Sequence, residues 1–189
     1  MLIDAKSDTT QEIPEIDSGR AIYVDFEGTK LDPPSLLGVF YFDEEYREDR
    51  FVQYVIEPGL SPGGDAKPQC VNQSLETTLQ EIVDLSRSEE REIVAWSSRE
   101  ALAVERYSRN SRLNEYFIDH LIDAKAIAKR WKRRFYPGVR FPYITGQGHH
   151  RLAEYMKLTG YSVSSSHGPG NTGQRIRYVR QQLFKHGGD

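Results

Sequence analysis

The chain has 189 residues, of which 38% are hydrophobic and 28% charged, with a formal net charge of −3. These values are typical of one soluble domain with a sizeable core, and no apolar run approaches the ~18 residues that a membrane-spanning helix needs. The single cysteine, Cys70, excludes an internal disulfide and favours a reducing, cytoplasmic location. We expect residues 1–19, which lack the apolar region of a signal peptide, to be a flexible lead-in, and residues 20–189 to form a single domain.

The first part of the chain alternates β-prone runs with turn residues. Strands are predicted at 21–26, 36–42 and 51–56. Because their connections are short, including an acidic loop at 43–49, we expect an antiparallel meander. Residues 60–71 are rich in Gly and Pro and are predicted to be a loop.

From residue 74 onward, helices and strands are predicted to alternate. The expected elements are a helix capped by Ser74, a strand at 93–96, a helix from 99 to about 109, a fifth strand at 116–122, a helix at 124–134 capped by Asp123, and helices at about 149–158 and 174–184. The predicted fold is therefore α/β, with a mixed five-stranded sheet and helices on its faces.

Charge is distributed unevenly along the chain. Residues 1–123 contain 12 Lys or Arg and 26 Asp or Glu, whereas residues 124–186 contain 13 Lys or Arg and one acid, Glu154. A half so poor in acids is typical of a phosphate-binding surface. Alternatively, the two halves neutralise each other across an internal interface, or simply face water.

Two carboxylates lie two residues apart in the first predicted strand, at Asp25 and Glu27. The two-residue period of a strand places both on one face, with Phe26 on the other. Like charges this close disfavour each other's ionisation unless a cation lies between them, and hard oxygen ligands suit Mg²⁺ or Mn²⁺. The pattern indicates a divalent-metal site, with a solvated acidic strand as the alternative.

On its element order over about residues 20–186 and on Asp25-Phe26-Glu27, the chain resembles the ribonuclease H-like superfamily, and within it the DEDD 3′–5′ exonucleases. In that family the first strand carries Asp-x-Glu, and a second acid, usually Asp, follows the fourth strand at the start of a helix. Glu100 stands at that second position here, although an acid in a first helical turn also suits the helix dipole. The resemblance implies two Mg²⁺ or Mn²⁺ ions held by Asp25, Glu27 and Glu100, and phosphodiester hydrolysis.

The final motif of that family, a last-helix Asp preceded by a His or a Tyr, is missing from residues 174–184. If His167 corresponds to the family His, Thr172 stands where the Asp belongs. One helix earlier, His149 lies five residues before Glu154, which makes both of them catalytic candidates. Placement favours Thr172 as the fourth ligand position and chemistry favours Glu154, so the position is left open.

The predicted helix at 124–134 is strongly basic. Lys125, Lys129 and Arg133 recur every four residues and align as one positive stripe. Trp131 and Phe135 are interleaved and suit stacking on the bases of a single strand, although Trp131 also fits a core-facing position. The expected nucleic-acid-binding residues are Lys125, Lys129, Arg130, Arg133, Arg134, Arg151 and Arg175.

These features favour a divergent 3′–5′ exonuclease-like protein that acts on DNA or RNA, with a single strand as its expected partner. One alternative is a nucleic-acid-binding or adaptor protein that keeps the fold and has lost the last metal ligand. A second alternative is a small domain with no nucleic-acid role, whose charges pair internally.

Overall fold

The structure, a computed structural model, describes residues 17–28, 32–60, 70–145, 148–161, 176–178 and 180–181. Its strands are β1 (Ile22–Glu27), β2 (Leu36–Asp43), β3 (Glu48–Val55), β4 (Cys70–Asn72), β5 (Ile93–Ala95) and β6 (Leu121–Asp123). Its helices are η1 (Pro58–Leu60, a 3₁₀ turn), α1 (Leu75–Ser88), α2 (Arg99–Tyr107), α3 (Ser111–Asp119), α4 (Ala124–Phe135) and α5 (Leu152–Leu158).

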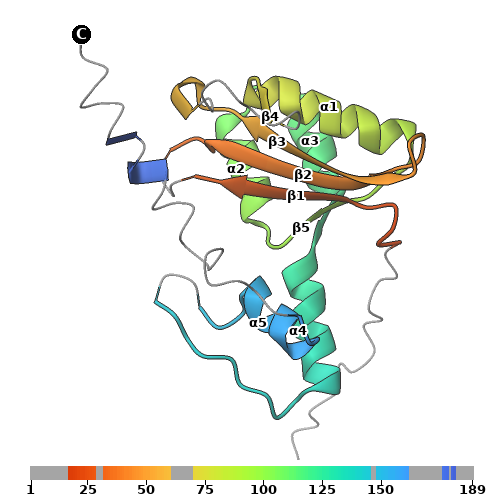
Figure 1. The fold of residues 1–189 in the computed structure, drawn as a ribbon, viewed down its shortest axis with the longest axis vertical. Helices are drawn as coiled ribbons and strands as arrows, with labels where there is room; N and C mark the ends of the chain where they lie inside the picture. The colour runs from red at the N-terminus through yellow and green to blue at the C-terminus, as the bar shows by residue number, and fades with distance from the viewer. Residues whose placement is uncertain are drawn as a thin grey trace, which may run out of the picture.

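The strands form one mixed six-stranded sheet in the order β4-β3-β2-β1-β5-β6. β1, β2 and β3 make the predicted antiparallel meander, whereas β5 runs parallel to β1, and β6 runs parallel to β5. β1 therefore lies inside the sheet, between β2 and β5 (Figure 1). The α/β class is confirmed, and the sheet has one strand more than predicted.

Side chains alternate across β1 as the two-residue period requires. Val24 is buried in the core, and the Phe26 ring contacts the Phe117 ring of α3 edge-on at 6.3 Å. Asp25 and Glu27 consequently lie on the opposite face, as predicted. Figure 1 shows α1 and α3 beside the strands, whereas α4 and α5 lie beyond β5, apart from the rest of the sheet.

The core is formed by the sheet, the apolar stripe of α1 and the buried residues of α2 and α3. The buried apolar residues of α1 are Leu75, Leu79, Ile82 and Val83, which have the spacing of one helix face, and Thr78 and Ser86 are buried as well. Burying a side chain of this size stabilises the fold by about 1.5–3 kcal/mol.

Two predicted helix caps are confirmed. The Ser74 side chain accepts a hydrogen bond from the Thr77 amide at 3.1 Å at the start of α1. Asp123 accepts one from the Ala126 amide at 2.9 Å at the start of α4. Each bond satisfies a backbone donor that the first turn of a helix leaves without a partner.

The prediction of a strand at 116–122 is wrong. Most of this range belongs to α3, whose start is capped by Asn110, and only its last residues enter β6. Leu113 and Phe117, four residues apart, form the buried face of α3. The helical period therefore begins before the apolar run that suggested a strand.

Three element boundaries also differ from the prediction. β4 lies at the end of the predicted loop and pairs in parallel with the end of β3, which adds the sixth strand. β3 already begins at Glu48, within the predicted acidic loop. α5 begins at Leu152 rather than at 149, after Gly148 with its positive φ of 75°.

Arg180 fastens the C-terminal helical residues to the sheet. Its guanidinium donates to Glu57 Oε1 at 2.8 Å, to Asp32 Oδ2 at 2.7 Å and to the hydroxyl of fully buried Ser35 at 3.0 Å. The Ser35 amide in turn donates to the carbonyl of Glu27 at 2.9 Å, at the end of β1. Residues 176–178 and 180–181 are helical, as predicted for this part of the chain.

Candidate functional site

The carboxyl ends of three neighbouring parallel strands lie together, and in open α/β sheets this is where ligands bind. Val24 of β1 is level with Ala95 of β5, which is level with Asp123 of β6. Asp25 is therefore one residue beyond the part of β1 that pairs with β5. Of the neighbouring strands, β5 is followed by Trp96 and the turn that starts α2, and β6 leads directly into α4.

Asp25 and Glu100 form a carboxylate pair at these strand ends. Glu100, in the first turn of α2, is only 7% exposed, and its pKa is raised to about 7, chiefly by burial and further by the negative charge of Asp25. The Ser97 hydroxyl donates to Glu100 Oε2 at 3.2 Å and offsets part of this shift. The surrounding protein also desolvates the Asp25 carboxyl and raises its pKa, although the residue as a whole is exposed.

Glu27, the third predicted metal ligand, lies on the same side of β1, half-buried. Within the described part of the chain, no group of three or more His, Cys, Asp or Glu side chains is arranged to hold a metal ion. The negative charge of Asp25 thus acts on Glu100, and no third carboxylate of the described residues completes a cluster with them.

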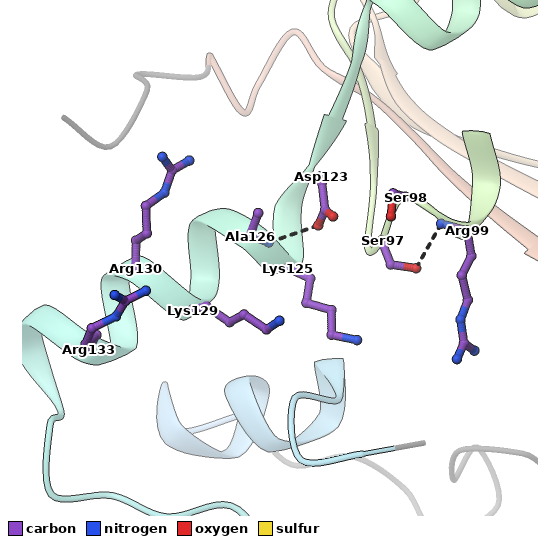
Figure 2. A pocket seen from close by; sticks show the side chains of 9 residues that line it. All are labelled: Ser97, Ser98, Arg99, Asp123, Lys125, Ala126, Lys129, Arg130 and Arg133. Carbon is purple, nitrogen blue, oxygen red and sulfur yellow. Dashed lines mark hydrogen bonds between the residues drawn. The ribbon is translucent and has the colours of Figure 1, made fainter. Parts of the chain in front are cut away.

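A cationic cavity of about 510 Å³ opens between the start of α2 and the first turns of α4. Figure 2 shows Lys125 and Lys129 extending from α4 toward the side on which Arg99 lies. The lining residues are Ser97, Ser98, Arg99, Asp123, Lys125, Ala126, Lys129, Arg130 and Arg133. The predicted stripe of Lys125, Lys129 and Arg133 therefore faces one cavity.

The cavity and the carboxylate pair adjoin each other through Lys125. Burial lowers the pKa of Lys125, and the positive charges of Lys129 and Arg99 lower it further, while Asp123 and Glu100 act in the opposite direction. The pKa of Lys125 is thus affected both by the cations of the cavity and by the buried Glu100 of α2. An anion bound in the cavity would relieve the repulsion among these cations.

The two catalytic candidates of the α5 region, Glu154 and His149, each contact neighbouring residues. Glu154 pairs with Arg151 at 2.8 Å and with Lys157 at 3.5 Å, so its charge is neutralised locally. His149 is exposed, and its Nδ1 lies 2.9 Å from the carbonyl oxygen of Phe141.

His150, which sequence reasoning did not select, is affected by the charges of two lysines that line the cavity. Its pKa is lowered by burial and then by the charges of Lys129, Lys132 and Lys125. Its Nδ1 lies 2.6 Å from the hydroxyl of Tyr155, whose ring contacts Trp96 at 5.4 Å. The sequence offered only the adjacent pair of histidines as a signal, and it does not show which of the two contacts Tyr155.

The remaining predicted residues fall into two groups. Arg134 lies over the Phe135 ring, 5.3 Å from its centroid, and Arg151 is held in its ion pair with Glu154. His167, Thr172 and Arg175 lie outside the described residues.

Comparison of the chain with protein-family models, with curated proteins and with solved structures gave no match. Among the helices of the described residues, none has the length and apolar character required to cross a bilayer.

Proposed function

We propose that this chain is a divergent, metal-dependent 3′–5′ exonuclease-like protein of ribonuclease H-like fold, which hydrolyses phosphodiester bonds of DNA or RNA. The observation that carries the proposal is the carboxylate pair of Asp25 and Glu100 beside a cavity lined by Lys and Arg. An antiparallel meander followed by parallel strands that alternate with helices supports the ribonuclease H-like part of the proposal.

The donors present suit Mg²⁺ or Mn²⁺. Two carboxylates with raised pKa values are stabilised in their charged forms by a cation placed between them. Mg²⁺ keeps several of its waters and is commonly bound by one or two carboxylates together with substrate phosphates. Asp25 and Glu100 would therefore hold one ion, and Glu27 with a substrate phosphate would complete a second site. When bound, such ions activate water and neutralise charge on the phosphate.

The chain's own residues supply binding and proton transfer. Arg99, Lys125, Lys129 and Arg133 would hold the phosphates that flank the cleaved bond, and these contacts carry no sequence preference. His150, whose pKa is lowered by burial and by the charges of Lys129, Lys132 and Lys125, would accept a proton in this region. His149 and Glu154 are the second choice, since Glu154 is already neutralised by Arg151 and Lys157.

The alternative is a nucleic-acid-binding or adaptor protein that does not hydrolyse its ligand. The local neutralisation of Glu154 favours it, and so does the lack of a third carboxylate beside Asp25 and Glu100 among the described residues. In that case the cationic cavity would still bind phosphate.

The test is a cleavage assay on 5′-labelled single-stranded DNA and RNA with Mg²⁺ or Mn²⁺. Wild type should shorten the strand stepwise, and Asp25→Asn and Glu100→Gln should each lose the activity. Glu105→Gln is the matched control, because Glu105 is an exposed acid of the same helix. Activity that survives Asp25→Asn would refute the metal assignment. Strand binding that persists in chelator, without cleavage at any metal concentration, would establish the adaptor.

A further inference from the structure

Three aromatic residues form a row across the face of the sheet that is turned away from the core. Tyr23 of β1 lies opposite Phe40 of β2, which lies opposite Phe51 of β3. Val24 and Val39, the next residues along β1 and β2, are buried in the core on the other face, as the two-residue period of a strand requires. Phe40 is 38% exposed and Phe51 is 47% exposed. These three residues, called the aromatic row below, are thus an apolar surface in the middle of the antiparallel meander.

The aromatic row is bordered by negative charge. The turn between β2 and β3, residues 43–49, contains five acids and one arginine. Asp49 lies on the same face of β3 as Phe51, two residues away, and both Asp49 and Glu45 are exposed. Within the described part of the chain neither of these two acids belongs to an ion pair, whereas the other three acids of the turn each have an arginine partner. A partner of the aromatic row would therefore meet two negative charges that the described residues do not neutralise.

Helix α4 carries a surface of matching character. Ile127, Trp131 and Phe135 recur every four residues, so they form one apolar stripe along the helix. None of the twelve residues of α4 is buried, and Phe135 is 56% exposed. All six charged residues of the helix are Lys or Arg. α4 is therefore a basic amphipathic helix whose apolar stripe is not packed into the core.

The apolar stripe of α4 and the cationic cavity lie on opposite sides of the helix. Lys129 and Arg133 line the cavity, and each stands two positions before a ring of the stripe. Two positions correspond to about 200° around a helix of 3.6 residues per turn. A phosphate in the cavity would consequently leave the stripe free. α4 also lies beyond β5, apart from the strands that carry the aromatic row (Figure 1).

A second copy of this chain fits both surfaces at once. The apolar stripe of α4 would cover the aromatic row, and basic residues beside the stripe, such as Arg134, would approach Asp49 and Glu45. Pairing of α4 with α4 of another copy would instead bring like charges together. Because every chain carries both surfaces, two copies related by a two-fold axis make the contact twice and leave neither surface open.

We infer that the protein forms a homodimer in which α4 of each protomer packs on the aromatic row of its partner. Burial of apolar surface supplies the affinity, and the opposite charges fix the orientation. Added salt should therefore weaken the dimer without abolishing it. The inference is independent of the proposed phosphodiester hydrolysis, because it uses the side of α4 that is turned away from the cavity.

Sedimentation velocity over a range of protein concentrations measures the dimer. Wild type should sediment as a dimer, and Phe135→Ser in the stripe and Phe51→Ser in the aromatic row should each raise its Kd at least about tenfold, because each removes a ring from both contacts. Leu102→Ser is the matched control, since Leu102 is 60% exposed on α2 and belongs to neither surface. A wild type that is monomeric at every concentration would overturn the inference, and so would a dimer that both ring variants leave intact.

Disulfide trapping identifies the two surfaces without relying on a loss of association. In a Cys70→Ser background, differently tagged Phe135→Cys and Phe51→Cys proteins are mixed and oxidised, and we expect a disulfide that joins the two tags. Leu102→Cys mixed with Phe51→Cys should give much less of it. Failure of the first pair to exceed this control would overturn the inference. Preferential trapping of Phe135→Cys with itself would also overturn it, because α4 would then pair with α4.

Discussion

Replacing Glu100 by Gln tests the buried carboxyl group at the centre of the candidate site. Ordinary Glu has a pKa of 4.5, whereas that of Glu100 is raised to about 7 by burial and by the charge of Asp25. The Gln side chain has nearly the same shape, and its carbonyl can still accept the hydrogen bond that the Ser97 hydroxyl donates. The substitution therefore removes the ionisation and little else.

The direction in which pH changes the free energy of unfolding follows from whether the folded or the unfolded protein binds the Glu100 proton more tightly. Between pH 4.5 and about 7 the unfolded chain has lost the Glu100 proton while the folded protein keeps it. The free energy of unfolding of wild type should consequently fall as pH rises through this window and level out above it. A tenfold difference in proton affinity is worth about 1.4 kcal/mol, so the whole effect is about 3 kcal/mol. The free energy of unfolding of Glu100→Gln should not fall in this way. At about pH 8 the variant should therefore be more stable than wild type by up to about 3 kcal/mol.

Urea denaturation followed by circular dichroism, from about pH 4.5 to about pH 8, measures this difference. The two proteins should be nearly equally stable at the acid end and diverge as pH rises. Glu105→Gln, at an exposed position of the same helix, should show no such divergence. A constant difference at every pH, or a variant less stable than wild type at about pH 8, would refute the reasoning.

Three further predictions concern the core, a cap and the C-terminal contact. Phe117→Ala should destabilise the protein by about 3–5 kcal/mol in urea denaturation, because Phe117 is fully buried; a loss below 1 kcal/mol would mean that its surroundings are loosely packed. Ser74→Ala should cost about 1 kcal/mol in the same assay and Ser74→Gly less, whereas equal stability of Ser74→Ala and wild type would contradict the cap. Arg180→Ala removes the hydrogen bonds to Glu57 and Asp32 and should accelerate hydrogen exchange of the amides at 176–178 and 180–181; unchanged exchange would show that other contacts hold these residues.

The first three strands, α1 and α4 were predictable because their signals are local. Alternation along β1, the helical spacing in α1 and the caps Ser74 and Asp123 each lie within a few neighbouring residues. α3 was missed because its period is anchored by Leu113, before the apolar run begins. β4 was missed because its three residues become a strand only by pairing with β3.

The site was predictable in part. Asp25, Glu100 and the basic stripe were all selected from the sequence, but their proximity depends on the register of β1, β5 and β6, which is a long-range property. The pairing of Glu154 with Arg151 and Lys157 follows from their three-residue spacing and was available from the sequence. The contacts of His150 could not be predicted from the sequence, because the Tyr155 hydroxyl and the charges of α4 come close to it only in the folded chain.

Calorimetric titration of Mn²⁺ into wild type, Asp25→Asn and Glu105→Gln at about pH 7.5 tests the central claim most directly, namely that Asp25 and Glu100 form a divalent-metal site. We expect heat of binding from wild type and Glu105→Gln, with proton release from Glu100, and none from Asp25→Asn. Equal binding by all three proteins, or no binding by wild type, would contradict the claim and leave the carboxylate pair without a metal.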